Sequence, residues 1–392
     1  MLNRKISLVE LYGHSEVLFV LYKLLKDNYD VSIFTTHAIF LDAKDYFESD
    51  LKGWHIQRTE ESTEQFLKRN SSSINENDLL IFTTLISSFR FFSNIKFKPT
   101  TIFIIHNANA FLAPKKHLWL DKSSFQNFTF DIIRFLRNEI QRDQYYKWKK
   151  KKKMNYISFS SNQLSKYAKT ITNDFDAKII KPFPFTFYEN YLKEEQKGKE
   201  IIISIPGSVT PNLRDYEIIL NALKEVIPVT KKKIILQLLG SSHRAYGQKL
   251  VKEIKGLENE NFQLVYFERL LSQKEFDQYL KQTDFIILPI KRYKRFGIVR
   301  EEYGQSSISG GLNDIIRFGI PTLLIDSYLI EKPFAPLIST FKNKIELVEK
   351  MTNWIENSTH VEIRKKTLPA LEKMNEENTR IGLVKQIENL LR

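Results

Sequence analysis

The sequence predicts an α/β protein of two doubly wound domains, in which helices cover both faces of parallel sheets. Strand-like and helix-like segments alternate through most of the chain, which is the pattern of such sheets. The length of 392 residues suits two domains. A polar, charged stretch at residues 188–200 interrupts the alternation near its middle and indicates an interdomain linker.

The first half alternates strands and helices up to about residue 190. Its elements are expected in this order: strand Lys5–Glu10, helix Ser15–Lys26, strands Val31–Thr35, Asp78–Thr84 and Thr100–Ile105, helix Phe130–Lys150, strand Tyr156–Ser160 and a last segment Asp176–Pro182. The runs at 78–84 and 100–105 are apolar and rich in β-branched residues, which is typical of strands buried on both faces.

The second half starts a new α/β series. Its strands are expected at Glu200–Ile205, Lys233–Leu239, Phe262–Phe267, Asp284–Leu288 and Thr322–Asp326, and its helices at Leu213–Val226, Gln273–Gln282, Asn343–Glu356 and Glu362–Leu391. We expect a first domain at 1–190, a second domain at 191–365 and a C-terminal helix at 366–392 that packs back on the first domain.

Composition limits the classes of binding partner and the cellular location that we expect. The formal net charge of +14 favours anionic partners such as nucleic acid, an anionic membrane surface or phosphorylated ligands. The absence of Cys excludes disulfides and thiolate chemistry, and with seven His residues no spacing picks out a metal site. The start lacks the apolar core of a signal peptide, and no apolar run approaches the ~20 residues of a membrane span. We therefore expect a cytoplasmic protein without a metal site.

A Ser/Gly-rich loop leads into a helix and a strand at Ser306–Leu324, SSISGGLNDIIRFGIPTLL. Ser309 is a suitable N-cap, and Gly310 and Gly311 allow a ligand to approach the backbone. Gly319 is expected to end the helix. Unpaired backbone N–H groups at such a helix start favour a phosphate or diphosphate, although the loop could equally be a tight connection.

Other candidate ligand-binding residues of the second half come directly after strands. Gly207, Ser208 and Arg214 lie between a strand and a helix, where the Arg side chain offers a fork for phosphate oxygens; the alternative is a polar turn. Gly240 and Ser241 follow the next strand and are candidates for lining the same site.

A basic segment, KRYKRFGIVREE, lies beside the predicted phosphate loop at Lys291–Glu302. Its cations, Lys291 and Arg295 in particular, could neutralise a diphosphate leaving group. The segment could also be a solvated mobile loop, and a lid that orders when a donor binds would satisfy both interpretations.

Two polar turns of the first half are candidates for an acceptor site. His106 and Asn107 come directly after a buried strand, where a cleft would lie, and the His could bond a sugar hydroxyl or act near the reacting centre. Gly13 and His14 occupy a similar place between a strand end and a helix start. Structural roles are the alternative for both turns.

Five consecutive lysines at Lys149–Lys153 follow Tyr and Trp residues. Each cation contributes ~1 kcal/mol near an anionic surface, so the run suits peripheral docking on a membrane, with the aromatic segment Phe89–Phe92 as a further contact. Salt-sensitive RNA binding and a solvated helix end are the alternatives. The chain has no recognisable RNA-binding signature, so we expect no nucleic-acid partner.

The second half resembles the donor domain of GT-B glycosyltransferases, closest in style to the large family-four retaining group. The segments that carry the resemblance are Ile205–Leu223, Leu238–Ser242, Leu280–Ile290 and Ser306–Leu324. The resemblance places Arg214 near the family's basic position for the donor diphosphate, Asp314 at the second Glu of its E-x7-E pair, and His106 at its cleft histidine. The first Glu of the pair falls at Ser306, so the pair is incomplete.

The resemblance implies a GT-B fold, two Rossmann-like doubly wound domains facing each other across a cleft. It implies transfer of a sugar from a UDP- or GDP-linked donor, bound by the domain at 191–365, to a glycan acceptor held by the domain at 1–190, without a cofactor or metal. If the lysine run docks on a membrane, we expect a lipid-linked acceptor in bacterial cell-envelope polysaccharide or glycoconjugate synthesis on the inner face of the membrane. A non-catalytic binding subunit of a partner enzyme is the alternative, because Ser306 replaces the Glu.

Overall fold

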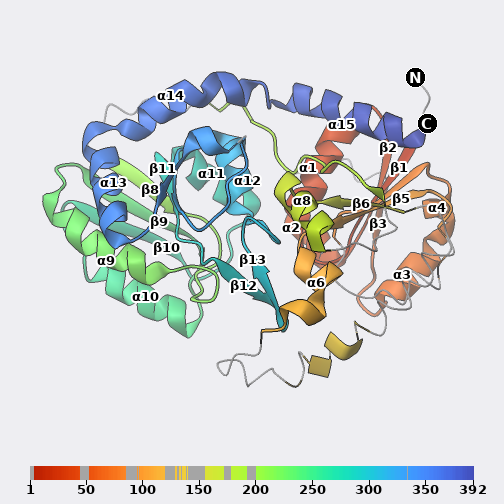
Figure 1. Cartoon of the computed structure of the whole chain (residues 1–392), viewed down its shortest axis with the longest axis horizontal. Coiled ribbons are helices and arrows are strands. Elements are labelled where there is room, and N and C mark those ends of the chain that lie inside the picture. Colours follow the sequence, from red (N-terminus) through yellow and green to blue (C-terminus); the bar gives the residue numbers. More distant parts are fainter. Residues whose placement is uncertain are drawn as a thin grey trace.

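The computed structural model describes residues 4–44, 53–84, 95, 97–119, 155–171, 178–191, 200–332 and 334–392, with isolated positions between 129 and 139. These residues form two α/β units that lie side by side, with the hairpin β12–β13 between them and the C-terminus beside the first unit (Figure 1). The predicted fold of two doubly wound domains is confirmed. Most of the helix expected at 130–150 lies outside the described residues.

The first domain is built on a seven-stranded parallel sheet with the order β3-β2-β1-β4-β5-β6-β7. Its strands are β1 Lys5–Glu10, β2 Asp30–Thr35, β3 Trp54–Ile56, β4 Leu79–Phe82, β5 Thr100–Ile105, β6 Asn155–Phe159 and β7 Lys178–Ile179. Its helices include α1 Ser15–Leu25, α2 His37–Ala43, α3 Thr63–Arg69, α4 Ser71–Asn75, α6 Ala108–Leu112 and α8 Asn162–Ile171. Strand β3 and helices α2, α3, α4, α6 and α8 were not predicted.

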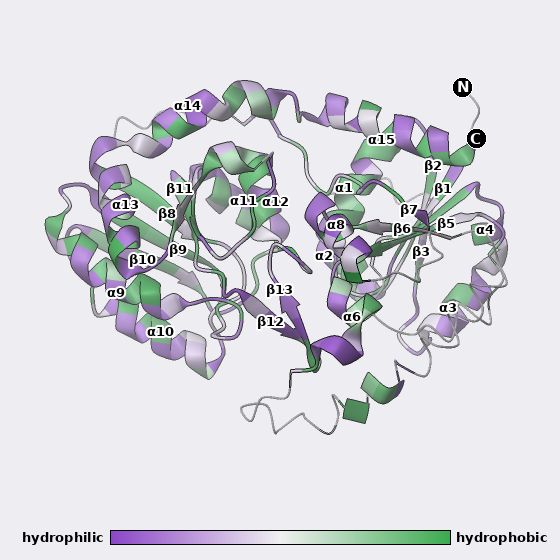
Figure 2. Cartoon of the chain, in the orientation of Figure 1, coloured by the Kyte–Doolittle hydropathy of each residue, from purple (hydrophilic) through white to green (hydrophobic). Residues whose placement is uncertain are grey.

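Neighbouring residues of the central strands enter different cores. Leu8 and Ile104 pack with α1 on one face of the sheet, whereas Val9 and Ile105 pack with Phe66 of α3 on the other. Both faces of these strands are therefore buried, which explains their nearly continuous apolar sequence. The strands of both sheets are hydrophobic and the outer helices are mixed (Figure 2).

The second domain has a six-stranded parallel sheet with the order β10-β9-β8-β11-β14-β15. Its strands are β8 Glu200–Ile205, β9 Lys233–Ser241, β10 Phe262–Phe267, β11 Phe285–Leu288, β14 Thr322–Ile325 and β15 Ile338–Phe341. Strands β12 Tyr293–Phe296 and β13 Val299–Glu302 form a separate antiparallel hairpin. The helices are α9 Tyr216–Val226, α10 Ala245–Lys255, α11 Gln273–Gln282, α12 Gly311–Phe318, α13 Lys344–Asn357, α14 Thr359–Glu372 and α15 Glu376–Leu391.

The expected single helix at 362–391 is wrong. The chain forms α14 and α15 there, and the break falls where the Asn375 side chain accepts a hydrogen bond from the backbone N–H of Asn378 and begins a new helix. The expected boundary at residue 366 consequently falls inside α14.

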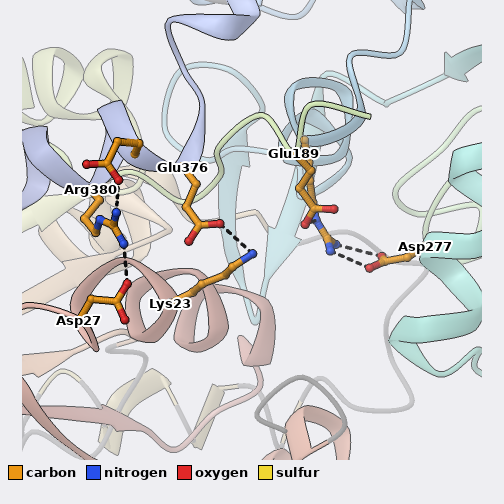
Figure 3. A network of polar contacts seen from close by, with 8 residues as sticks. Lys23, Asp27, Glu189, Asp277, Glu376 and Arg380 are labelled. Atoms are coloured by element: carbon orange, nitrogen blue, oxygen red, sulfur yellow. Dashed lines mark hydrogen bonds and ion pairs between the residues drawn. The ribbon is translucent and has the colours of Figure 1, made fainter. Parts of the chain in front are cut away.

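Helix α15 returns to the first domain. Leu383 and Ile387 are buried in the same core as α1. Ion pairs join Lys23 to Glu376 at 2.9 Å and Arg380 to Asp27 across this contact (Figure 3). The chain therefore crosses between the domains twice, before β8 and again between α14 and α15.

Candidate functional site

The turn after β1 is fixed by a buried carboxylate. Glu10 accepts hydrogen bonds from the backbone N–H of Tyr12 at 2.7 Å and Gly13 at 3.2 Å, and from the hydroxyls of Thr83 at 2.6 Å and Thr84 at 2.5 Å. Gly13 has φ of +132°, a conformation open to glycine and rarely to other residues. The turn is therefore rigid and brings α1 directly to the domain interface.

The predicted residues His14 and His106 lie together, with ring centroids 4.3 Å apart. His106 donates from Nε2 to the Thr83 carbonyl at 2.8 Å, and burial together with the charge of His14 lowers its pKa to about 3. Burial acts to lower the pKa of His14 too, but a 2.9 Å contact with Glu16 and the charges of Glu16 and Glu10 outweigh it and raise that pKa. The pair therefore combines a neutral ring with one that is readily protonated.

Arg214 is buried at the carboxyl edge of the second sheet, with 8% of its surface exposed. Its guanidinium donates to the backbone oxygens of Pro206 at 2.7 Å and Ser208 at 3.2 Å, and its Nε has no partner within the described part of the chain. It lies against Gly207, where an added Cβ would come within 2.3 Å of its Nη2. No carboxylate pairs with Arg214 among the described residues. A buried cation without a counter-charge favours an anionic ligand.

Gly240 and Ser241 have structural partners. Both lie within β9, and a Cβ at Gly240 would come within 2.1 Å of the Gly207 carbonyl oxygen. The Ser241 hydroxyl donates to the Glu268 carbonyl oxygen at 2.8 Å and contacts His243 at the same distance. The absence of a side chain at Gly240 thus lets β9 pack directly against the loop that holds Arg214.

The start of α12 differs from the expectation. The helix begins at Gly311 with Gly310, and not the predicted Ser309, as its N-cap; the backbone N–H of Ser309 donates to the Tyr328 hydroxyl at 3.3 Å. The structure gives no partner to the N–H groups of Gly310 and Gly311 among the residues it describes. Gly319 ends the helix at φ of +59°, as predicted.

The serines before α12 bind the opposite domain. The N–H groups of Ser306 and Ser307 both donate to the Glu302 carbonyl oxygen. The Ser307 hydroxyl donates to Asn107 Oδ1 at 3.0 Å, and the side-chain amide of Asn109 donates to the Ser306 hydroxyl at 3.2 Å. These N–H groups are already paired, which corrects the expectation that the whole loop presents free donors. Asn107 likewise has its partner in the second domain.

Two glutamates of the second domain accept hydrogen bonds at helix starts in the first. Glu301 accepts from the N–H of Ala110 at 2.7 Å and of Asn109 at 3.3 Å in α6. Glu331 accepts from the N–H of Gln163 in α8 at 3.0 Å. Carboxylates at helix starts satisfy otherwise unpaired donors, so these contacts hold the domains together.

The basic segment forms the hairpin β12–β13 rather than a loop, because Tyr293 pairs with Glu302 and Phe296 with Val299. Lys291 is exposed outside the hairpin, and Arg295 Nε donates to the Gly297 carbonyl oxygen at 3.1 Å. Strand β12 is hydrophilic (Figure 2).

Lys294, one of the cations of the predicted basic segment, is the one whose charge reaches both histidines. Burial lowers its pKa, and its charge acts on both His14 and His106 across the interface. Its Nζ lies 4.9 Å from the ring centre of Tyr303. Burial raises the pKa of the Tyr303 hydroxyl, and the charge of Arg214 opposes that rise. Successive side chains of a strand point to opposite faces, so Lys294 and Arg295 lie on different sides of β12. This alternation of side chains could have distinguished Lys294 in the sequence.

Asp314 lies in the first turn of α12. Burial raises the pKa of its carboxyl to about 7, against the opposing charges of Arg317 and Arg214, while Asp277 and Glu16 add to the rise. The structure gives this carboxyl no hydrogen-bond or ion-pair partner among the described residues. Asp314 therefore brings a proton-accepting group to the same interface as Arg214.

Membrane and metal features are reported for the described part of the chain only. No helix there is long and apolar enough to cross a membrane. No group of three or more His, Asp or Glu side chains in that part is arranged to hold a metal ion. The segments Lys149–Lys153 and Phe89–Phe92 lie outside the described residues.

Comparison with known proteins gives similarities of structure. No protein-family model matches the chain, and no curated protein matches its sequence. The structure is similar to Anabaena HepE in complex with UDP and glucose, at a TM-score of 0.64 and 12% identity over 98% of this chain and 100% of that one. It is also similar to the N-terminal domain of Candida albicans trehalose-6-phosphate phosphatase. The TM-score is 0.61 and the identity is 11%, over 100% of this chain and 97% of that one.

A third similar structure is the lipopolysaccharide outer core galactosyltransferase WaaB, at a TM-score of 0.54 and 11% identity over 99% of both chains. At such identities the likeness concerns the fold. The fold of this chain is GT-B, with two Rossmann-like domains.

Proposed function

We propose that the chain is a glycosyltransferase that moves a sugar from a nucleoside diphosphate sugar, UDP- or GDP-linked, to an acceptor hydroxyl. The observation that carries the proposal is the buried guanidinium of Arg214, which has no carboxylate partner among the described residues. Its acceptor Pro206 also lies against Gly311, at the start of α12, where the described residues give the N–H groups of Gly310 and Gly311 no partner. HepE is described in complex with UDP-glucose, which supports a donor of this class.

In the proposed reaction, the bond between the anomeric carbon and the phosphate oxygen breaks, and its electron pair leaves on the diphosphate. The acceptor hydroxyl oxygen bonds to that carbon and gives its proton to the departing phosphate. Arg214, with Gly310 and Gly311, would stabilise the charge that develops on the leaving group. Because these fixed donors and charges supply the stabilisation, the reaction would need no metal ion, and EDTA should leave turnover unchanged.

Asp314 is proposed to bond the donor's ribose or to position the phosphate loop, and His106 to act near the reacting sugar, in the manner of the family-four retaining group. The acceptor would be a glycan or lipid-linked glycan of the cell envelope, made on the cytoplasmic side of the membrane with Lys149–Lys153 as a membrane contact. The description of WaaB as a lipopolysaccharide galactosyltransferase supports this setting.

Calorimetric titration of the protein with UDP, GDP, ADP and CMP tests the proposal. We expect one nucleoside diphosphate to bind at micromolar strength and Arg214→Ala to weaken it at least tenfold, because a hydrogen bond to a charged group contributes ~1.5–3 kcal/mol. Arg244→Ala, at the start of α10, is the control. Unchanged affinity in Arg214→Ala would contradict the assignment.

A second candidate is a binding subunit without turnover. It is favoured by the hydrogen bonds of Ser306 and Ser307 to the first domain, at the place where the resemblance expects a glutamate. Nucleotide binding without hydrolysis or transfer over a panel of sugars and acceptors would support it.

A further inference from the structure

A cavity of about 350 Å³ lies between the two domains and the last helix, and its size is that of pockets that hold small molecules. The first domain contributes segments 160–163 and 181–186 to its wall, the second domain contributes segment 328–331, and α15 contributes residues between 378 and 386. Of the described residues that were assigned above to the nucleotide sugar or to the acceptor, none lines it. The cavity is therefore a separate site, and a molecule bound there would touch both domains at once.

Apolar side chains with accessible surface gather in the wall of this cavity. Leu329 exposes 52% of its surface, and Ile308, Ile330, Phe334 and Met374 are half-buried. These five side chains come from three separate stretches of the second domain, and all of them line the cavity. Covering their exposed surface would release water from it, so the wall favours a ligand with an apolar body.

The unpaired polar groups of the wall are a cation and hydrogen-bond donors. The Lys181 ammonium has no carboxylate partner among the described residues, and the backbone N–H groups of Phe185 and Thr186 have no acceptor in that part of the chain. The Glu331 carboxylate also lines the cavity, but it accepts a hydrogen bond at 3.0 Å from the N–H of Gln163 at the start of α8, where the helix dipole stabilises its charge. Unused donors beside a cation favour an acidic group on the ligand.

We propose that this cavity binds a small organic anion, an apolar body that carries one acidic group, and that the bound anion bridges the two domains. The apolar body would lie against Leu329 and Phe334, and the acidic group would bind the Lys181 ammonium. The formal net charge of +14 favours ligands of this sign. The proposal does not rest on sugar transfer, so Arg214→Ala should bind the anion as wild type does.

Two fluorescent probes that differ in one group test the need for an acidic group. The probe 1-anilinonaphthalene-8-sulfonate carries a sulfonate, and N-phenyl-1-naphthylamine is the same aromatic body without it. Wild type should bind both probes saturably. Lys181→Met should weaken the sulfonate about fivefold, as expected for one partly exposed ion pair, and leave the uncharged probe unchanged. Lys178→Met, at an exposed position of β7 outside the cavity, is the matched control and should leave both affinities unchanged.

A second pair of variants tests the apolar wall. Leu329→Ser should weaken both probes about fivefold, because it removes apolar contact area that the two probes share. Leu41→Ser is the matched control, because Leu41 in α2 is 45% exposed and lies outside the cavity. It should leave both affinities unchanged.

Hydrogen exchange measures whether the bound anion holds the domains together. The N–H of Gln163 in the first domain donates to Glu331 of the second, so its exchange reports on separation of the domains. With the sulfonate probe at roughly ten times its dissociation constant, this exchange should slow about tenfold, because the ligand stabilises the joined state by that factor. The N–H of Ile218, which donates to Asp215 within the second domain at 3.3 Å, is the control and should exchange at an unchanged rate.

Each of four results would overturn the proposal. They are the absence of saturable binding of the sulfonate probe to wild type, an unchanged affinity for that probe in Lys181→Met, unchanged affinities for both probes in Leu329→Ser, and unchanged exchange at Gln163 when the probe is bound. These measurements use no nucleotide, so their failure would leave the glycosyltransferase proposal standing. A protein that binds neither UDP nor GDP would in turn leave the anion site standing.

Discussion

His14 and His106 stack at 4.3 Å although their pKa values move in opposite directions. His106 is held neutral by burial, and its hydrogen bond to the Thr83 carbonyl fixes the proton on Nε2. His14 has a carboxylate neighbour, Glu16, and is readily protonated. A pair of this kind makes the first domain sensitive to acid at the face that meets the second domain.

The free energy of unfolding should depend on pH through His106. Its pKa is about 3 in the folded protein and ~6.5 when unfolded, so its stabilising contribution is complete above pH 6.5 and is lost as the pH falls towards 3. His106→Phe should remove this loss. Relative to wild type, the variant should gain about 2 kcal/mol between pH 7 and pH 4.5 in urea unfolding, whereas His243→Phe, at an exposed position, should gain nothing. Parallel curves for all three proteins would contradict the assignment.

The affinity for UDP-glucose should rise as the pH falls from 8 to 6. The Asp314 carboxyl, with its pKa of about 7, lies in the field of Arg317, Asp277, Glu16 and Arg214, and its protonation removes a negative charge near the proposed diphosphate site. About 1 kcal/mol of repulsion corresponds to about fivefold in affinity. Asp314→Asn should bind equally at both pH values. A wild-type affinity that falls on acidification would show that the ionised carboxylate itself holds the donor.

Lys294→Met should lower turnover and nucleotide affinity at least tenfold. Lys294 lies near Tyr303 and acts on both histidines, and we expect it to provide the second cation for the leaving diphosphate. Lys291→Met, at an exposed position just before the hairpin, is the matched control and should behave as wild type. If Lys291→Met lowered turnover in a steady-state assay and Lys294→Met did not, Lys291 would be the second cation at the diphosphate.

Glu301→Ala should loosen the contact between the hairpin and α6. The variant leaves the N–H groups of Asn109 and Ala110 without their acceptor, so their hydrogen exchange should accelerate at least tenfold. Glu302→Ala is the control, because the Glu302 carboxylate pairs with the partly exposed Arg292 at 2.7 Å. Unchanged exchange at α6 would mean that other contacts hold the domains.

The sequence predicts local features of the fold better than contacts between the domains. Buried strands such as β5 and β8 are visible as apolar runs, and Gly319 ends α12 as expected because the left-handed conformation favours glycine. The hairpin β12–β13 was missed because its strands are short and charged, and their pattern gives no apolar stripe.

The partners of the candidate residues depend on contacts that no local pattern contains. Ser307 bonds to Asn107, which lies 200 positions away in sequence. The bonds that occupy the serine loop therefore arise only when both domains are folded, and the loop's sequence alone could equally present free N–H groups. Arg214 could be predicted from the sequence because β8, a glycine turn and this basic residue follow one another along the chain. That order is a local signal.

The return of α15 to the first domain has a consequence for biosynthesis. Leu383 and Ile387 complete a core whose other members lie before residue 188, so the ribosome must translate the entire second domain before that core can close. One core of the second domain lies within residues 201–355 and the other also includes Tyr188 and Leu371, so both can close before α15 is translated. Until then the nascent first domain exposes the apolar surface that α15 will cover, and it is at this stage of synthesis that chaperones would be needed most.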